Sequence, residues 1–510
     1  MTTDTIKFKR GVKNKLNKLA YGEPAYISDE GELYIGTKSG VEKLTSNKEV
    51  KELSSQLEQI ENGVTDIVLN VKMFGVRGNG EDETDAIQSV IENAPVGSTI
   101  LFPAGCNFSF STLNINKHII INSVGATLTQ STSQNVFINI NSDNVKIYGG
   151  NYVVKGTNGI NVNGKNSSVS SIKVDGGEHG ILIQGNNCIV EDCISENAQY
   201  AGFKINFAYG DKRDCVTIRN CVSKNFKFKG IVYNGTIGSR KIIIENFKGI
   251  TNTTNTASDN ILIDAGDGTE SSYFIDEVII DNAYLYGGES NSMKIYNTNN
   301  LILRNIYARN EHSKYSSSSG LRVFAKNSYL ENIDIDNRII ANEDIKINGL
   351  YFSSNATPYS IIELTGSGKK ADFNNINLNV EKVSSYAIRV TRNEGVQHKI
   401  ILDNYNAPTG IKIFGIFKYP PNTAGFIEVY DKKLLTNYNI AASSQNEDEI
   451  IRSPRTFVAS KLPSRGTYNK GDIIYNSSLT AGGNLGWVCI SPGTFGGTAP
   501  TFKAFGTIEK

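Results

Sequence analysis

The sequence predicts an all-β protein: a right-handed parallel β-helix, preceded by a short coiled coil and flanked by a small β module at each end. Three observations predict the β-helix: a short phrase repeated at variable spacing, alternating apolar residues inside it, and Gly and Asn breakers every few residues. A fixed unit at variable spacing is typical of a solenoid whose coils stack while their loops differ in length. Alternation with period two indicates strands that bury one face, so the coils are β rather than α.

The repeated phrase is an apolar residue, any residue, and then Asn, Asp or Gly. Its ten occurrences end at Gly149, Gly176, Asp192, Asn220, Asn246, Asn282, Asn305, Asn332, Asn375 and Asn404. A second phrase, a small or polar residue followed by an apolar one, comes after most of them, as in Gly202-Phe203. We expect roughly ten to twelve coils. The seven asparagines should stack at one turn, with their side-chain amides bonded from coil to coil.

The region before the β-helix contains two parts. Residues 1–45 form a small, basic unit with a β-type pattern. Residues 48–70 carry a heptad seam at Val50, Leu53, Leu57, Ile60, Val64 and Ile67. Ile at one set of core positions favours trimers or tetramers over dimers, although an ordinary amphipathic helix is the alternative. Fewer than three heptads cannot sustain an oligomer alone, so we expect the following segment to contribute.

The β-helix itself is expected over residues 71–430. Strands at 71–76 and 99–103 should flank a helix at 82–94, which Asp82 or Glu81 can cap. The apolar stripe of this helix would cover the open end of the solenoid and protect its unpaired edge. We expect residues 431–460 to form a linker and residues 461–510 a small β module rich in Gly and aromatic residues.

Composition excludes several classes of function. A net charge of +1 gives no electrostatic case for binding nucleic acid or an anionic membrane surface. The six cysteines form neither a disulfide framework nor a metal-ligand spacing, so we expect no metal and no cofactor. No apolar run approaches the ~20 residues of a membrane span, and the N-terminus lacks the pattern of a secretory signal. We therefore expect synthesis in the host cytoplasm without a signal peptide, and no membrane insertion.

Three segments resemble known families. The segment 74–80, continued by 84–88 and closed by 101–105, resembles the entry segment of the pectate-lyase-like (pectin-lyase-like) β-helix superfamily, although Asn79 stands where an Asp is usual. The first 45 residues resemble the attachment module of bacteriophage tail fibres and spikes, and residues 486–502 are similar to small terminal modules of phage spikes. The resemblance implies a tail appendage of the virion, typically homotrimeric, joined to other tail or baseplate proteins, that binds host surface glycans and often degrades them.

No catalytic signature is present. The segment most similar to the Gly-His-Gly motif of polygalacturonase-type enzymes is Glu178-His179-Gly180. A single His without such a motif more often has a structural role. Calcium-dependent lyase chemistry needs a carboxylate cluster. Asp264, Asp267 and Glu270 are candidates, with solvated turn carboxylates as the alternative.

Loop length points to one flank of the solenoid. The distance from the first phrase to the second is 10 positions after Asn220, but it is 14 after Asn246, 15 after Asn305 and 28 after Asn332. Long loops on one side of a solenoid form the walls of a groove. We expect this flank to bind sugar through Tyr307, Arg309, His312, Tyr315 and Arg322.

Hydrolysis on this flank requires two carboxylates about 5–5.5 Å apart for retention or about 6.5–9.5 Å apart for inversion. Glu289 and Glu311 are the expected pair, with Asp264 third. For elimination the roles change, and an Arg, Lys or His removes a proton beside a carboxylate.

Three functions remain open on the sequence. The first is a trimeric tail spike and receptor-binding protein that binds and depolymerises a host polysaccharide such as capsule, exopolysaccharide or teichoic acid. The second is an adhesive or structural appendage of the same fold without turnover, which the missing catalytic signature favours. The third, a bacterial extracellular pectin-type lyase, is disfavoured by the front module and the missing secretory signal.

Overall fold

The computed structural model describes most of the chain. The described residues are 9–11, 19–27, 32–46, 67–207, 215–234, 240–252, 258–265, 274–288, 290–310, 319–354, 357–366, 370–384, 386–392, 398–408, 411, 414–418, 427–431, 441–442, 450–452, 456–468 and 470–509. The chain divides into two units, Met1–Val68 and Leu69–Lys510, which are described separately. The expected heptad seam falls almost wholly on residues outside the described ranges.

The N-terminal unit contains one four-stranded sheet. Its strands, in sheet order, are β1 (Lys9–Gly11), β2 (Pro24–Ile27), β3 (Glu32–Thr37) and β4 (Gly40–Ser46). The pair β1–β2 is parallel, and β2–β3 and β3–β4 are antiparallel.

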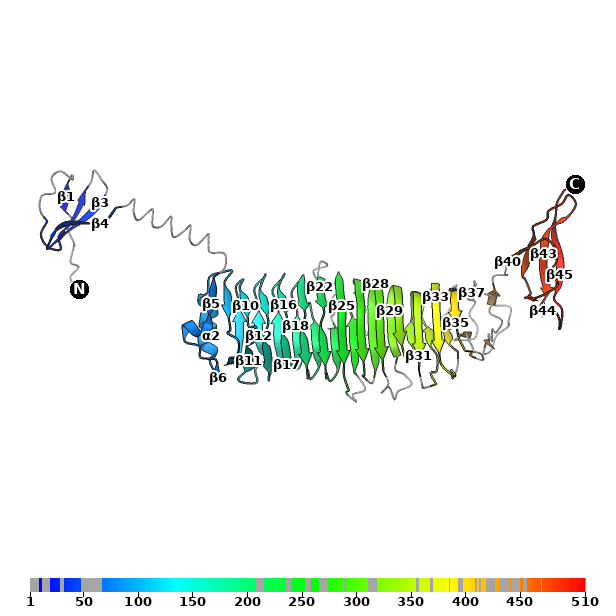
Figure 1. The fold of residues 1–510 in the computed structure, drawn as a ribbon, viewed down its shortest axis with the longest axis horizontal. Helices are drawn as coiled ribbons and strands as arrows, with labels where there is room; N and C mark the ends of the chain where they lie inside the picture. Colours follow the sequence, from blue (N-terminus) through cyan, green and yellow to red (C-terminus); the bar gives the residue numbers. More distant parts are fainter. Residues whose placement is uncertain are drawn as a thin grey trace. The chain divides into compact units, whose positions relative to one another are not determined.

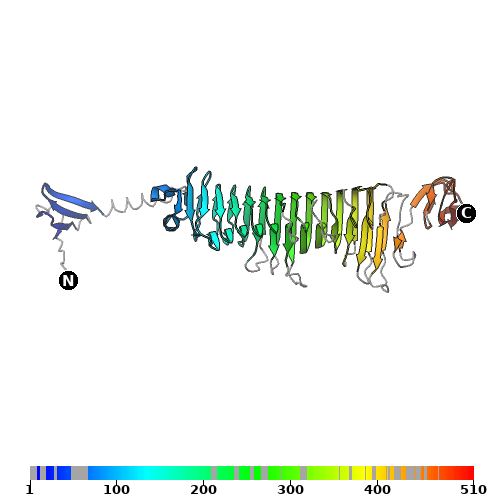
Figure 2. The ribbon, with the colours of Figure 1, turned by 90° about the horizontal axis from the view of Figure 1, so that it is seen from below.

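The second unit is built mainly from three parallel sheets, which we call I, II and III in the order in which the chain enters them within each coil (Figures 1 and 2). Sheet I contains β5 (Val68–Asn70), β7 (Thr99–Leu101), β10 (Ile120–Asn122), β13 (Lys146–Tyr148), β16 (Ser168–Ser170), β19 (Cys188–Glu191), β22 (Cys215–Arg219), β37 (Ile427–Asp431) and β39 (Ile450–Arg452). Sheet II contains β6 (Asn79–Asp82), β8 (Asn107–Phe110), β11 (Thr127–Gln130), β14 (Asn151–Val154), β17 (Lys173–Gly176), β20 (Ile194–Glu196) and β23 (Val222–Lys224). Sheet III contains β9 (Leu113–Ile115), β12 (Val136–Ile140), β15 (Asn158–Val162), β18 (His179–Ile183), β21 (Ala201–Ile205), β24 (Lys229–Asn234), β26 (Asp259–Asp264), β30 (Ile339–Ala341), β32 (Ile362–Leu364), β34 (Ile388–Arg392), β36 (Phe414–Lys418) and β38 (Ala441–Ala442).

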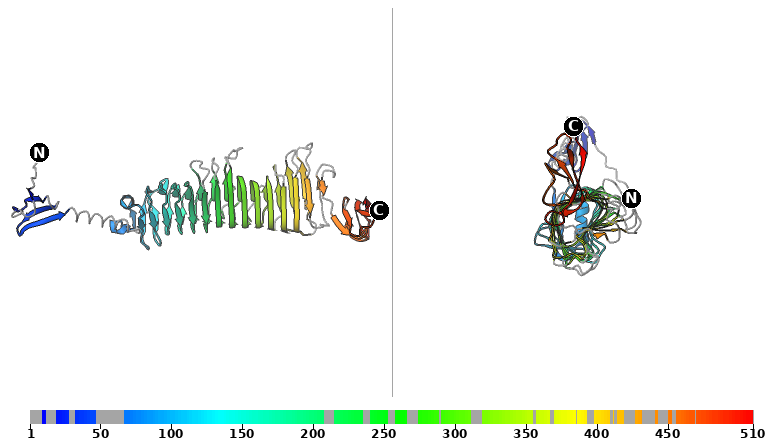
Figure 3. Two further views of the ribbon diagram at one scale, coloured as in Figure 1. Left: turned by 90° about the horizontal axis from the view of Figure 1, so that it is seen from above. Right: turned by 90° about the vertical axis from the view of Figure 1, so that its right-hand side faces the viewer.

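Later coils contain longer strands that bend from one sheet into the next (Figure 3). The strands β25 (Lys241–Ile250), β27 (Ile275–Tyr286), β31 (Asp344–Ser353), β33 (Lys370–Asn379) and β35 (His398–Asn406) pass from sheet I into sheet II. The strands β28 (Asn291–Arg309) and β29 (Ser319–Ile335) pass through all three sheets. The architecture is thus the right-handed parallel β-helix that the sequence predicts. The segment 431–460, where the sequence predicts a linker, contributes β38 and β39 to the sheets.

Stacked apolar residues fill the tube. In sheet III the second phrase lines up in register as Ile160, Ile181, Phe203, Ile231, Ile261, Met293 and Leu321, all fully buried. Burying one such side chain stabilises the fold by about 1.5–3 kcal/mol, so a continuous internal column provides much of the driving force.

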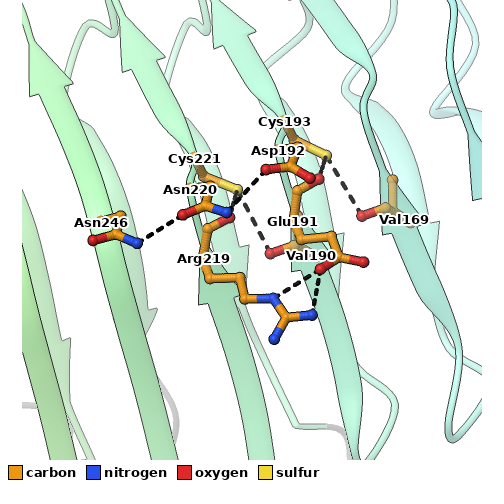
Figure 4. A network of polar contacts seen from close by, with 9 residues as sticks. All are labelled: Val169, Val190, Glu191, Asp192, Cys193, Arg219, Asn220, Cys221 and Asn246. Carbon is orange, nitrogen blue, oxygen red and sulfur yellow. Dashed lines mark hydrogen bonds and ion pairs between the residues drawn. The ribbon is translucent and has the colours of Figure 1, made fainter.

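The Asn column occupies the turn between sheets I and II. Asn220, Asn246 and Asn282 all have φ between 52° and 56°, a left-handed conformation that Asn tolerates better than most residues. Their amides bond from coil to coil, Asn220 to Asp192 at 3.0 Å and Asn246 to Asn220 at 2.8 Å (Figure 4). Asn282 donates in the same way to Asn246 at 2.7 Å. Beneath this turn, Cys193 is fully buried on the adjacent coil. The bonding pattern of the Asn column changes at Asn305, whose side-chain amide donates to Asp281 at 2.9 Å. The side chain of Asn404 lies outside the described residues.

Two positions of the predicted repeat are wrong. Val174-Asp175-Gly176 lies in sheet II, and the true counterpart of Ile147 is Val169, whose coil turns at Ser171 with φ 54°. The expected 28-residue excursion after Asn332 is a further coil, in which Ile347 pairs with Leu330 and Phe373. Its turn has Gly349 at φ 85° in place of Asn, so the Asn column skips it.

The N-terminal end of the β-helix carries α2 (Thr84–Asn93), whose Ile87, Val90 and Ile91 are buried. The predicted helix is confirmed, but its N-cap residue is Glu83, whose carboxylate accepts the N–H groups of Arg77 and Gly78 at 2.6 and 2.9 Å. The predicted strand at 71–76 is wrong, because η2 (Val71–Phe74) forms a 3-10 turn there. Within the described ranges, no helix is long and apolar enough to cross a membrane.

The C-terminal module has a sheet in the order β40 (Thr456–Ala459), β42 (Ile473–Asn476), β43 (Asn484–Ser491), β45 (Thr501–Thr507). A second small sheet pairs β41 (Thr467–Tyr468) with β44 (Gly493–Thr494). Tyr468 packs edge-on against Phe457, Phe495 and Phe502, with ring centroids 5.2–6.3 Å apart. A cluster of half-buried aromatic rings therefore packs this module together, beside the buried side chains of Ile474 and Cys489.

Candidate functional site

The structure describes four of the eight residues proposed for the site. Asp264, Tyr307, Arg309 and Arg322 are described. Glu289, Glu311, His312 and Tyr315 lie outside the described residues. The predicted carboxylate pair therefore stays a prediction.

Tyr307 and Arg309 lie on the outer side of sheet II. Tyr307 stacks on Tyr284 with centroids 4.8 Å apart and planes within 6°, and the Arg309 guanidinium lies 4.1 Å from the Tyr307 centroid. Arg309 also forms an ion pair with Asp334 at 2.6 Å. The Arg309 guanidinium and the Tyr307 ring therefore form an ordered stack, in which the guanidinium is already paired with Asp334.

Asp264 and Arg322 belong instead to sheet III. Asp264 accepts a hydrogen bond from Asn297 at 3.0 Å, and Arg322 Nη1 donates to Tyr296 Oη at 3.4 Å. The structure thus divides the described candidates between two faces and does not gather them into one cluster.

The outer face of sheet III carries a row of charged residues, which we call the basic row. It consists of Lys229, Lys294, Arg322, Arg338 and Arg389, with the carboxylates Asp259 and Glu363. Inward and outward positions alternate in a strand, so the middle residue of an apolar–charged–apolar triplet must face outward. Met293-Lys294-Ile295 and Leu321-Arg322-Val323 are such triplets, and Lys294 pairs with Arg322 in register. Successive rungs lie about 4.8 Å apart, so the row runs along the β-helix axis.

Asp259 anchors the first part of the row. Its side chain is fully buried and forms ion pairs with Lys229 and, at 3.7 Å, with Lys294. The backbone N–H and side-chain amide of Asn291 also donate to Asp259 Oδ1, at 3.1 and 2.9 Å. This carboxylate therefore positions two ammonium groups and has no oxygen left for acid catalysis.

Glu363 anchors the second part. It accepts hydrogen bonds from Arg338 at 3.2 Å and from Arg389 at 2.7 Å. The Arg389 guanidinium lies 4.9 Å from the ring centroid of Tyr359, which is 45% exposed. An exposed ring beside two oriented guanidinium groups suits a sugar that carries a negative charge.

The electrostatics of the row favour an anion. Among the described residues, five cations face two carboxylates, which leaves a net charge of +3. Burial lowers the pKa of Lys294, and the charges of Lys229 and Arg322 lower it further, whereas Asp259 opposes them. Burial also lowers the pKa of Arg338. Because partly buried charges are poorly screened by water and salt, this face attracts anions more strongly than an exposed surface of equal charge. Within the described ranges, no three His, Cys, Asp or Glu side chains gather as a metal site requires.

Aromatic rings extend the face on the N-terminal side of the row. His179, Tyr200 and Phe228 lie on successive coils with ring centroids 5.4 Å apart. His179 is buried, its Nδ1 lies 2.9 Å from Asn158 Oδ1, and burial together with the charge of Lys204 lowers its pKa to about 4. It is therefore neutral at physiological pH, which fits the structural role that the sequence favours.

Sequence reasoning missed most of the row because it followed loop length. Of the seven charged residues, only Arg322 was a candidate, since the others lie within strands or, like Arg338, in what seemed a long loop. A signal did exist: the charged residue directly follows an inward apolar residue of sheet III in Met293-Lys294, Leu321-Arg322, Ile362-Glu363 and Ile388-Arg389, although only the first two of these apolar residues belong to the second phrase. A comparison of the residue at this position in successive coils would have identified four members of the basic row, Lys294, Arg322, Glu363 and Arg389.

No family model and no curated protein matches the sequence. Similar solved structures include the A-module of a mannuronan C-5 epimerase from Azotobacter vinelandii (12% identity, TM-score 0.38, covering 76% of this chain and 99% of that one). They also include a mutant tailspike protein of the E. coli bacteriophage HK620 in complex with a hexasaccharide (10%, 0.40, 88% and 93%). A third is a surface adhesin of Streptococcus pneumoniae (14%, 0.32, 72% and 100%).

Proposed function

We propose that this protein is a bacteriophage tail spike that uses the basic row on sheet III to bind an anionic host cell-surface polysaccharide. Capsule, exopolysaccharide and teichoic acid all contain members with carboxylate or phosphate groups. The observation that carries the proposal is the row itself: oriented, partly buried cations along sheet III, held in place by two carboxylates, with exposed Tyr359 at one end. A polymer lying along the axis meets a cation on most rungs.

The location on a virion tail is supported by the sequence. Residues 1–45 resemble phage attachment modules, and the structure describes a four-stranded sheet within them. We propose that this module joins other tail or baseplate proteins, whereas the β-helix presents the glycan-binding face.

Binding is tested with the purified full-length chain and the anionic polysaccharides of candidate hosts, by calorimetry at several salt concentrations. Replacing Arg338 with Gln removes one oriented charge, and hydrogen bonds to charged groups contribute about 1.5–3 kcal/mol, so affinity should fall roughly 10- to 100-fold. Arg219→Gln is the matched control, because Arg219 pairs with Glu191 on sheet I, away from the row, and should bind as the parent does. Affinity should also decline with added salt. Equal binding of neutral polymers, or binding that ignores salt, would argue against the proposal.

We further propose that the spike is a homotrimer. The heptad seam at residues 50–67 favours parallel association, and sheet I carries an outward apolar column on consecutive rungs, Ile243, Ile279, Ile302 and Tyr329. Parallel copies around a threefold axis would bring like rungs of this column to the same height.

The trimer has a direct test. Light scattering should give a native mass of three chains of 55.7 kDa, and Ile279→Asp should lower the stability of the assembly to dilution. A monomeric parent protein would refute the assembly and leave the glycan proposal standing.

We also propose, as a more specific function, that the spike cleaves the polysaccharide that it binds. The alternative is an adhesive spike that binds the polysaccharide without cleaving it. Hydrolysis would use Glu289 and Glu311, with Asp264, as the sequence proposes. Asp259 and Glu363 are each engaged by two cations, an arrangement that supports binding without hydrolysis by these two groups. In the adhesive alternative, Gln at positions 289 and 311 would leave every activity of the particle unchanged.

A further inference from the structure

An apolar patch lies on the first coils of the β-helix, at the end that carries α2 (Figure 1). Val68, Met73, Phe74 and Val124 are 54%, 80%, 54% and 55% exposed. By contrast, no large apolar side chain is exposed among the described residues from 125 to 283. Exposed apolar groups are therefore concentrated where the β-helix begins, and such a concentration marks an interaction surface.

The patch follows one turn over three consecutive coils. The chain passes from sheet I to sheet II through Met73 and Phe74 after β5, through Ala104 after β7 and through Val124 after β10. Ala104 is exposed as well, and a Cβ added at Gly125 would lie 2.8 Å from Ala104 Cβ, so these coils are in close contact at the turn. We call these residues, together with the exposed residue at the start of β5, the collar patch: Val68, Met73, Phe74, Ala104 and Val124.

The chemistry of the collar patch suits a protein surface and not a sugar. All five side chains are apolar, so none of them can bond the hydroxyl groups of a glycan. The neighbouring charges are engaged elsewhere: Lys72 Nζ lies 3.6 Å from Cys106 Sγ, and Arg77 pairs with Glu81 at 2.6 Å. Covering the patch with another apolar surface therefore removes apolar area from water without burying a charge.

The position of the patch in the chain indicates what covers it. Val68 directly follows Ile67, the last residue of the heptad seam. An extended chain spans at most about 3.3–3.6 Å per residue, so Met73 lies within about 22 Å of the end of the seam. Parallel association of the seams of several copies therefore brings their collar patches close together. Residues near a threefold axis meet their own counterparts.

We propose that the collar patch is a self-association surface, which packs against the collar patches of two further copies of this chain. This inference rests on the proposed homotrimer and names a surface that holds it together. The seam has fewer than three heptads, whereas a stable interface takes about 20–30 residues on each side. The collar patch supplies apolar area directly after the last residue of the seam.

The outward column of sheet I continues from the collar patch. β5 pairs with β7, and β7 pairs with β10, where Ile120 belongs to the same outward column as Ile243. The residues of this column between those two are Lys146, Ser168, Ile189 and Thr217. Three of these four are polar, so the collar patch and the later apolar column are separate areas of contact. Variants in one can be tested without altering the other.

The test uses the full-length protein and light scattering over a dilution series. Met73→Asp and Phe74→Asp each place a charge in the patch, and each should raise the concentration at which the trimer dissociates by roughly 10- to 100-fold, the effect of one buried side chain of this size. Ala86→Asp is the matched control, because Ala86 is exposed on α2 at the same end of the β-helix, and the variant should associate as the parent does. Met73→Leu keeps an apolar side chain and should also match the parent.

Cross-linking provides a second measurement, which does not depend on loss of association. Met73→Cys places one new thiol per chain in the collar patch, and a short three-armed maleimide should join three chains into one band on a denaturing gel. Ala86→Cys and the parent protein, treated in the same way, should remain single chains.

The outcomes separate the collar patch from the homotrimer. Weaker association of both Asp variants, with Met73→Cys cross-linked into trimers, supports both proposals. A trimeric parent whose Asp variants dissociate as the parent does, and whose Met73→Cys chains stay single, overturns the collar patch and leaves the homotrimer. A monomeric parent overturns both and leaves glycan binding. An unchanged trimer that loses affinity for another tail protein in Met73→Asp would show that this protein, and not a second copy, covers the patch.

Discussion

Asp259→Ala is expected to lower the free energy of unfolding by about 3–5 kcal/mol, the range for removing one partner of a buried ion pair. Asp259 is fully buried, and Lys229 beside it is 9% exposed, so the variant leaves an ammonium group without its counter-charge inside the protein. Asn291 loses the acceptor of two hydrogen bonds as well. Urea unfolding followed by circular dichroism measures the change.

Two further variants identify the cause of this loss. Glu191→Ala removes a partner of an exposed ion pair, Arg219–Glu191, and should cost at most about 1 kcal/mol. The double variant Lys229→Met, Asp259→Leu replaces the buried charges by apolar groups and should recover most of the stability. If Asp259→Ala lowers the free energy of unfolding no more than Glu191→Ala does, the Lys229–Asp259 pair is not desolvated.

Gly287→Ala is the second change for which we expect a large effect, a destabilisation of about 2–5 kcal/mol. Gly287 has φ 76°, where an L residue costs about 1–2 kcal/mol. A Cβ there would lie 1.8 Å from the Thr251 carbonyl oxygen, a backbone atom that cannot move aside, and overpacking adds about 1–3 kcal/mol. The same turn donates to Arg309 O at 2.9 Å and precedes Lys294, so binding should weaken together with stability.

Gly97→Ala is the control for backbone conformation alone. Gly97 has φ 86°, but nothing lies within 4 Å of an added Cβ. We expect the conformational cost of about 1–2 kcal/mol there and no steric cost. Equal melting temperatures for the two variants would mean that the coil at Gly287 relaxes freely around the new methyl group.

Much of the fold follows from local chemistry and could be predicted. Asn220, Asn246 and Asn282 mark the turn because Asn adopts positive φ with little cost and its amide can bond along the stack. The prediction failed where another residue meets the same requirement. Ser171 turns its coil at positive φ, so a search for Asn, Asp or Gly misplaced that coil, whereas Ile347-Asn348-Gly349 fits the repeated phrase and went unrecognised.

The candidate site was less predictable. Arg322 was found, but Lys294, Arg338 and Glu363 were not, because each looks like an ordinary charged residue in a strand or loop. Arg338 and Glu363 lie 25 positions apart, and Lys229 and Asp259 lie 30 apart. Their contact depends on how many residues each intervening coil takes, which short-range patterns do not encode.

The sequence by itself determined the winding of this protein, because periodicity of two, Asn turns and glycine breakers are local properties of the chain. The tertiary structure alone decided which charges become neighbours, since a coil of variable length sets the register between strands. It also decided how readily these groups ionise. Burial lowers the pKa of Lys294 and raises the pKa of Tyr296 only because the neighbouring coils cover both side chains.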